Sequence, residues 1–126
     1  VESTPGTFDV VICMEMLEHV PTPSKIIRAC AQLVKPSGHL FFSTLNRHPR
    51  SFLEAIVGAE YLLGLLPKGT HDFSQFIRPS ELCRWARSAK ICIDDVAGLR
   101  FNPATRQYKL SKNIQVNYLC HGQPVT

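Results

Sequence analysis

The sequence predicts an α/β fold built on a parallel sheet. Two short segments rich in β-branched and aromatic residues, at 8–13 and 39–46, flank a segment with helical apolar periodicity, and Pro and Gly mark the turns between them. This strand–helix–strand order is typical of a right-handed βαβ unit with parallel strands. Because ligands bind outside the carboxyl ends of such strands, we expect a site near Cys13–Glu15 and Thr44–Asn46.

The composition is typical of a folded domain with a modest charge. Of the 126 residues, 44% are apolar and 19% are charged, which allows a core to be buried. The net charge is +4, and the Lys and Arg residues are scattered singly, so we expect no nucleic-acid partner. The chain begins at Val1 without Met or a signal peptide, so we expect either processing or an absent front segment.

The cysteines indicate a reducing environment. They stand singly and their number is odd, which argues against a disulfide framework and against a clustered zinc site. Cys92, for example, lies between Ile91 and Ile93, so we expect buried, reduced thiols and a cytoplasmic protein. The five cysteines are Cys13, Cys30, Cys83, Cys92 and Cys120.

The first elements follow from the apolar pattern. Residues 8–13 (FDVVIC) are mostly apolar, which predicts a strand buried on both faces. Residues 14–23 form a polar connection that contains two prolines. We expect a helix over Ser24–Lys35, because apolar residues recur there at spacings of three and four, and Lys35–Gly38 should end it before the strand at 39–46.

The middle of the chain carries a densely apolar segment at 51–66. It is shorter than the roughly 20 residues that span a bilayer, so it is either a buried helix or a helix that covers a pocket or lies on a membrane. The loop of 15 residues at 67–81 is long enough for a function to be plausible. We expect a further helix from about Pro79, with Ser80 as its N-cap.

The last third of the sequence has the pattern of strands. One strand is expected from Ile91 to Leu99, followed by a turn at 101–103. Alternation of apolar and polar residues predicts a final strand at 114–121.

Several motifs are familiar in combination. The segments FDVVICMEMLEHV and LVKPSGHLFFSTLN are similar to the fourth and fifth strand motifs of the class I S-adenosylmethionine-dependent methyltransferases. Together with VGAEYLLGLLPKGTHDFSQFIRPSEL, GLRFNP and VNYLCH, they resemble the ubiquinone-biosynthesis O-methyltransferases, from about Phe8 to His121. The resemblance implies the C-terminal half of a Rossmann-like sheet, with parallel strands, an antiparallel terminal hairpin and a helical insertion or lid at 47–79.

The resemblance also implies an activity. Such enzymes methylate a polyprenylated catechol or demethylubiquinol with S-adenosyl-L-methionine. The family's glycine-rich cofactor loop does not occur in this sequence, so we expect residues 1–126 to be a partial domain that lacks the N-terminal cofactor-binding half and is inactive alone. Two alternatives stay open: a class I methyltransferase that acts on another small phenol, and a non-catalytic module that binds membranes.

Glu15, Glu18 and His19 are the main candidates for chemistry. On a helical turn they share one face, so two carboxylates and one imidazole could meet a single Mg²⁺ ion. The resemblance supports this, because some family members look metal-dependent through the same E-x-x-E-H motif. Glu15 and His19 are also candidate catalytic groups, since a phenol must lose its proton before it is methylated. The alternative is that Glu15 contacts the cofactor, Glu18 caps or pairs, and His19 packs in the loop.

Four further residues have either a functional or a structural interpretation. Met14 ends a strand, and its thioether suits contact with the adenosyl group that the resemblance implies, although it could be a plain core residue. Asn46 either orients the acceptor ring or shapes a turn. His71, in the PKGTH motif, is a candidate base or positioning residue, with a surface histidine as the alternative. His39 follows a turn and is expected to be structural.

The flanks of the apolar segment suggest a lipid contact. Arg47, Arg50 and Lys68 lie around it, and basic flanks favour anionic lipid surfaces. The polyprenyl tail of the implied substrate would also suit an apolar portal. We therefore expect a cytoplasmic protein that contacts the inner face of the membrane peripherally.

Overall fold

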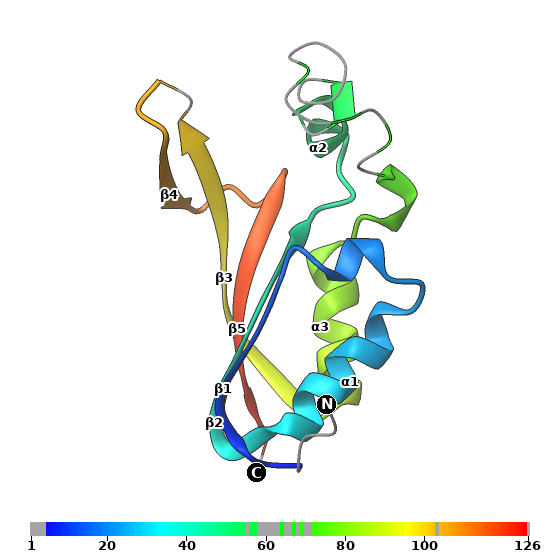
Figure 1. Cartoon of the computed structure of the whole chain (residues 1–126), viewed down its shortest axis with the longest axis vertical. Coiled ribbons are helices and arrows are strands. Elements are labelled where there is room, and N and C mark those ends of the chain that lie inside the picture. Colours follow the sequence, from blue (N-terminus) through cyan, green and yellow to red (C-terminus); the bar gives the residue numbers. More distant parts are fainter. Residues whose placement is uncertain are drawn as a thin grey trace.

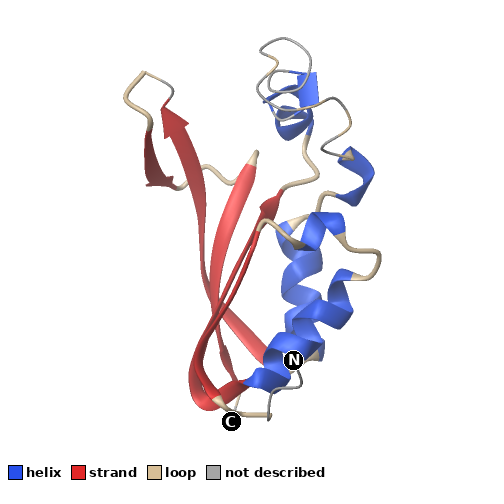
Figure 2. Cartoon of the chain, viewed as in Figure 1, coloured by secondary structure: helices blue, strands red, loops and turns tan. Residues whose placement is uncertain are grey.

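The computed structural model describes residues 5–54, 56–57, 64, 67, 69, 72–102 and 104–125. Five strands form a curled sheet, and the longer helices pack against one side of it (Figures 1 and 2). The described elements are β1 (Phe8–Met14), η1 (Leu17–His19), α1 (Pro23–Leu33), β2 (Val34–Leu45), α2 (Pro49–Ser51), η3 (Phe73–Gln75), α3 (Pro79–Ser88), β3 (Ile91–Asn102), β4 (Gln107–Ser111) and β5 (Asn117–Pro124).

The strand order confirms the predicted βαβ unit. The order across the sheet is β1-β2-β5-β3-β4, and β1 and β2 pair in parallel. The last strand, β5, lies between β2 and β3 and is antiparallel to both. Strand β4, which the sequence pattern did not predict, forms an antiparallel hairpin with β3. The final strand also begins at Asn117 and continues to Pro124, three residues later at each end than predicted.

The connection between α1 and β2 differs in detail from the prediction. The helix ends at Leu33, and Val34 already pairs with Phe8 of β1. Residues 35–38 then leave the ladder, which resumes where Val10 pairs with His39. Gly38 is required there, because a Cβ atom would lie 2.7 Å from the carbonyl oxygen of Asp9. The predicted interruption at 35–38 is therefore present, but within the strand.

The core lies between the sheet and the two longer helices. Leu40 and Phe42 of β2 are fully buried, as are Ile27 of α1 and Leu82 of α3. Tyr118 of β5 is buried with them, and its hydroxyl group donates a hydrogen bond of 2.7 Å to the carbonyl oxygen of Ile77. This bond provides a partner for the polar end of a large buried ring.

The other side of the sheet is open, so the prediction that residues 8–13 are buried on both faces was wrong. Phe8, Val10, Ile12 and Met14 of β1 are 42–62% exposed, with Ile12 the most exposed. We call this surface the open face; no helix of the described residues covers it, as Figure 2 shows. The strand is apolar on both sides, but only one of these sides is packed.

The open face also carries a hydrogen-bonded chain of polar side chains. His39 of β2 and His121 of β5 approach through ring nitrogens 2.9 Å apart, and His121 contacts Asp94 of β3 at 2.5 Å. The rings of His39 and His121 stack, with centroids 5.1 Å apart. Because these contacts join three neighbouring strands, they agree with the structural role expected for His39.

The start of α3 and the cysteines need two corrections. The helix begins at Pro79 as predicted, but its N-cap is Arg78, whose backbone N–H donates to Oε1 of Glu81 at 2.9 Å. Ser80 lies inside the first turn, because proline already occupies its first position. Among the five cysteines, Cys13, Cys30 and Cys120 are buried, Cys83 is half-buried, and Cys92 is exposed, contrary to expectation.

Only part of the apolar segment at 51–66 can be compared with the prediction. Helix α2 covers its first residue, and a π-helical turn follows over the described residues among 52–57. Most residues from 58 to 66 lie outside the described part of the chain. Among the described residues, no helix is long and apolar enough to cross a membrane.

Candidate functional site at the carboxyl ends of β1 and β2

The predicted site residues follow the carboxyl end of β1. Strands β1 and β2 are parallel, so their carboxyl ends meet at one edge of the sheet, where the chain continues into η1 and toward α2 (Figure 1). Met14 is paired with Ser43 in this register. The residues that follow Met14 therefore lie beside the last residues of β2, where a ligand of a parallel sheet is expected.

Glu15 makes the turn that ends β1. Its φ angle is 54°, in the left-handed region that non-glycine residues rarely adopt. The backbone N–H of Glu15 donates to the carbonyl oxygen of Ser43 at 3.0 Å and to the Ser43 hydroxyl at 3.1 Å. These bonds hold a strained backbone conformation at the strand end, a feature that is common at functional sites.

Glu18 is held differently, in the interior. Only 4% of the residue is exposed, and the Thr44 hydroxyl donates a bond of 2.7 Å to its Oε2 atom. Its Oε1 atom lies 3.9 Å from Nε2 of His19, whose side chain is about half-exposed. A buried carboxylate needs such partners, since an unpaired charge there would be costly.

The two carboxyl groups influence each other. Burial raises the pKa of Glu15 above its ordinary value, and the neighbouring Glu18 carboxyl raises it further by charge repulsion and by hydrogen bonding. The Ser43 hydroxyl and the His19 imidazole lower the pKa of Glu15, but they offset only part of the rise. The arrangement therefore raises the pKa of Glu15, so this carboxyl group binds a proton more readily than an ordinary glutamate, which is the direction that suits a general base.

The structure brings together some predicted residues and leaves others untested. Glu15, Glu18 and His19 come close together, as a turn at 14–20 predicted, although the helical part of that turn is a short 3₁₀ segment. Within the described ranges, no group of three or more His, Cys, Asp or Glu side chains is spaced to hold a metal ion. Met14 is partly exposed on the open face. His71 lies outside the described residues.

Ser43 and Thr44 contact the candidate residues Glu15 and Glu18, and the sequence prediction did not include them. Both stand at the carboxyl end of β2, and their contacts to Glu15 and Glu18 bridge 26–28 residues of sequence. The feature of the sequence that could have identified them is the pair of hydroxyl residues at the end of the mostly apolar segment 40–45. Asn46, by contrast, uses its side-chain amide to donate a bond of 2.8 Å to the carbonyl oxygen of Ile114, which supports the turn-shaping alternative.

Comparisons with known proteins agree with the fold. A family model described as a methyltransferase domain matches residues 1–90. The solved structure of a methyltransferase from Thermotoga maritima, described as S-adenosylmethionine-dependent and as a possible histamine N-methyltransferase, aligns with a TM-score of 0.66 at 13% identity. That alignment covers 98% of this chain and 59% of the other, and at this identity it shows the fold alone.

Two curated relatives are much closer in sequence. The ubiquinone biosynthesis O-methyltransferase of Pseudomonas fluorescens is 58% identical over 94% of this chain. The protein of the same name from Azotobacter vinelandii is 61% identical over 91%. The matched regions are 51% and 50% of those proteins, so the chain spans about half the length of these relatives. With its fold and its family match, the chain belongs to the methyltransferase domain family.

Proposed function

We propose that this chain supplies the acceptor side of an S-adenosyl-L-methionine-dependent O-methyltransferase that acts on a polyprenylated catechol or demethylubiquinol in ubiquinone biosynthesis. The observation that carries this proposal is the identity of 57–61% to curated enzymes of that name over most of the chain. The carboxylate cluster at the carboxyl ends of β1 and β2 supplies groups that suit the reaction. A methyltransferase for another small phenol is the alternative within the same family.

The chemistry assigns a role to Glu15. When bound, S-adenosyl-L-methionine supplies an electrophilic methyl group, and the acceptor oxygen must be held about 3–3.5 Å from it. A phenol is mostly protonated at neutral pH, so a group beside the oxygen must accept its proton. The raised pKa of Glu15 suits a general base. Thr44 holds Glu18 in place, and Glu18 in turn tunes Glu15.

Met14 and His19 have supporting roles in this proposal. Met14 ends β1 on the open face, partly exposed beside the cluster, where its thioether could contact the adenosyl group. The half-exposed His19 imidazole is the second candidate base, since it can reach a ligand without disturbing buried Glu18. His71 is kept as a candidate positioning residue from the sequence alone.

Methyl transfer by the longer protein that carries this sequence tests the proposal. With a demethylated quinol and labelled cofactor, Glu15→Gln should lower kcat by about 10²–10⁴-fold, the usual contribution of a general base. Lys109→Gln, on exposed β4, is the matched control and should keep the full rate. Full activity of Glu15→Gln would exclude Glu15 as the general base. If the protein without substitutions leaves the quinol unmethylated, the proposed reaction is wrong.

A preceding segment completes the cofactor site in this proposal. The outer edge of β1 has no strand beside it among the described residues, and the adjacent open face is apolar. The relatives contain about as much sequence again as this chain spans. We infer that their additional half joins the sheet at β1 and binds most of the cofactor. Calorimetry should therefore detect cofactor binding by the longer protein and not by residues 1–126; equal affinities would contradict this division.

A magnesium ion is a separate part of the proposal. The donor types of Glu15, Glu18 and His19 suit Mg²⁺, and a cation would relieve the repulsion between the two carboxyl groups. Their spacing in the described structure does not complete a site, so the mechanism above uses no ion. Chelation followed by Mg²⁺ should remove and restore activity if the ion is required. Unchanged activity after chelation would reject it.

Peripheral contact with anionic lipid is the alternative binding function. Phe52 and Leu53 are exposed at the start of the apolar segment, which favours a portal or lipid-facing surface. Two of the expected basic flanks are engaged within the protein, since Arg47 pairs with Glu81 at 2.9 Å and Arg50 lies 3.8 Å from Glu54. Lys68 lies outside the described residues. Flotation with anionic vesicles should decrease on Phe52→Ser plus Leu53→Ser; unchanged flotation would reject this surface.

A further inference from the structure

The β3–β4 hairpin carries a concentrated positive charge. Four basic residues lie on it or directly after it, and all four are exposed: Arg100, Arg106, Lys109 and Lys112. No Asp or Glu occurs in residues 96–126, and within the described residues none of the four takes part in an ion pair. Of the 14 Lys and Arg residues, the ten others are balanced by the ten Asp and Glu residues, so the net charge of +4 arises at the hairpin.

Two of these charges face each other across the hairpin. The register pairs Arg100 of β3 directly with Lys109 of β4. Like charges in this position destabilise an antiparallel pair of strands. A lysine on an edge strand can prevent pairing with another chain, but that role does not require a second basic residue opposite it. An anionic surface placed against the pair would remove the repulsion, so the arrangement favours an anionic partner.

The other side of the hairpin is apolar. Side chains alternate along a strand, so Tyr108 and Leu110 lie on the side opposite to Lys109. They are 68% and 63% exposed. Apolar side chains next to long basic ones are typical of segments that bind the interface of an anionic bilayer, because the apolar groups enter the headgroup region while the basic groups reach the phosphates. The hairpin therefore suits a lipid surface.

The hairpin lies at the same end of the sheet as α2. Strands β2 and β3 are both antiparallel to β5, so they run in the same direction, and the turn after β3 is at the end where β2 leads to α2 (Figure 1). Arg50 of α2 donates a bond of 3.5 Å to Gln115, in the connection after β4. Phe52 and Leu53 are exposed at this end too. A bilayer is a plane that can contact both projections at once, which favours lipid over an acidic protein segment.

We propose that the β3–β4 hairpin docks on an anionic lipid bilayer, where its basic residues bind headgroup phosphates and Tyr108 and Leu110 enter the interface. This inference rests on the lipid contact proposed above for Phe52 and Leu53, and adds a charged contact to it. Strand β4 forms the edge of the sheet opposite to β1, so a segment that joins the sheet beside β1 leaves the hairpin exposed. Docking would turn the carboxyl ends of β1 and β2 toward the membrane.

Flotation of the longer protein that carries this sequence tests the proposal. The vesicles contain phosphatidylcholine, with or without phosphatidylglycerol. Arg100→Gln plus Lys109→Gln should lower the partition coefficient on anionic vesicles about thirtyfold, because each basic residue at such a surface contributes a factor of about five. High salt should weaken the binding of the unaltered protein. Equal binding to both kinds of vesicle, or full flotation of the double variant, would overturn the proposal.

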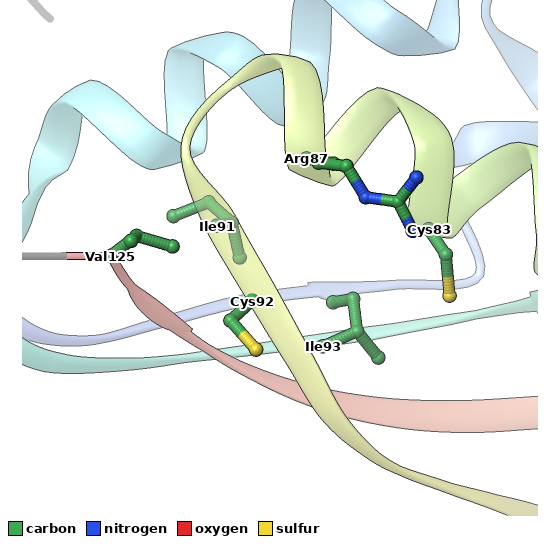
Figure 3. A pocket seen from close by; sticks show the side chains of 6 residues that line it. All are labelled: Cys83, Arg87, Ile91, Cys92, Ile93 and Val125. Carbon is green, nitrogen blue, oxygen red and sulfur yellow. The ribbon is translucent and has the colours of Figure 1, made fainter.

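A matched control removes the same charge from another surface. Arg84 and Arg87 are exposed on α3, and Arg87 lies beside the first residues of β3, at the end of that strand remote from the hairpin (Figure 3). Arg84→Gln plus Arg87→Gln should keep the partition coefficient within about twofold. Equal losses in the two double variants would show that binding follows the net charge and not the hairpin.

The apolar side of the hairpin is tested without a change of charge. Tyr108→Ser plus Leu110→Ser should lower the partition coefficient on anionic vesicles about tenfold, because less apolar surface enters the interface. Binding to poly-L-glutamate should not change in this variant. If the unaltered protein binds poly-L-glutamate but not anionic vesicles, the partner is an acidic macromolecule and the proposal is wrong.

Two further readouts separate docking from folding and from methyl transfer. Arg100→Gln plus Lys109→Gln removes a like-charge pair, so its resistance to urea should be equal or slightly greater, and a folding defect cannot then explain lost flotation. The hairpin takes no part in the chemistry, so this variant should methylate a dissolved quinol at the full rate. A protein that methylates but does not float would reject the docking alone. One that floats but does not methylate would reject only the proposed reaction.

Discussion

The two faces of the sheet differ in what covers them, although strand β1 carries apolar side chains on both. On the helix-covered face, alternate residues of β2 such as Leu40, Phe42 and Thr44 are fully buried. On the open face, Phe8, Val10 and Ile12 of β1 are 42–62% exposed. The difference shows that the apolar pattern of β1 does not by itself reveal which side is packed, since the described residues cover only one of its two sides. Neighbouring residues on β2 make this comparison testable, because they share a strand but not a face.

The largest difference is expected between Phe42 and Phe41. Phe42 is fully buried against the helices, so Phe42→Ala should lower the free energy of unfolding by about 3–5 kcal/mol. Phe41 lies on the other face, where its ring contacts His121 at a centroid distance of 5.0 Å, and Phe41→Ala should cost roughly 1 kcal/mol. Urea unfolding of both variants measures the contrast. Equal losses would mean that the open face is packed in solution.

The next pair, Thr44 and Ser43, extends the comparison to the candidate site. Thr44→Val removes the hydroxyl that donates to buried Glu18 and should cost about 1–3 kcal/mol. Ser43→Ala should cost about 0.5–1 kcal/mol, because the Glu15 N–H keeps its bond to the Ser43 carbonyl oxygen. Urea unfolding again gives the two values. A larger loss for Ser43→Ala would contradict the assignment of Thr44 as the residue that holds the buried carboxylate.

These contacts show where prediction from sequence succeeds. The order of β1, α1 and β2 follows from apolar periodicity and from Pro and Gly, and these features also located the carboxyl ends of the two strands. The placement of Glu15 and Glu18 at the candidate site could be predicted because they are close in sequence to a strand end. Their hydroxyl partners could not, since the bonds depend on a register between strands 26–28 residues apart.

The missed elements have local explanations. Strand β4 is only five residues long and almost wholly exposed, and the alternation of Tyr108 and Leu110 with polar residues is too short to identify a strand from sequence. The last strand begins late because Asn113 forms a turn in which its side-chain oxygen accepts from the N–H of Gln115 at 3.0 Å. Cys92 is exposed because the strand edge beside it is open, a property that its apolar neighbours do not reveal.

Alkaline pH tests the burial of a thiol on the covered face. Burial raises the pKa of Cys120 from 9.0 to about 12, so its contribution to stability is complete below about pH 9 and is lost as the pH rises through 12. Between pH 8 and pH 11, the free energy of unfolding should therefore fall more steeply with pH for the unaltered chain than for Cys120→Ala. The loss should shrink rather than vanish, because burial also raises the pKa of Tyr118.

The smallest effect on stability is expected at Ile12, and it tests the open face most directly. Ile12 is 62% exposed, so Ile12→Lys should change the free energy of unfolding of residues 1–126 by no more than about 0.5 kcal/mol. The same change should decrease self-association in sedimentation experiments, since a charge on an apolar edge strand opposes pairing with another copy. We further propose that, in the longer protein, the preceding segment that joins the sheet at β1 also covers this face. The lysine would then be buried, and the loss should reach several kcal/mol. Equal small losses in residues 1–126 and in the longer protein would show that the face stays open. The proposed preceding segment would then have to contact another part of the sheet.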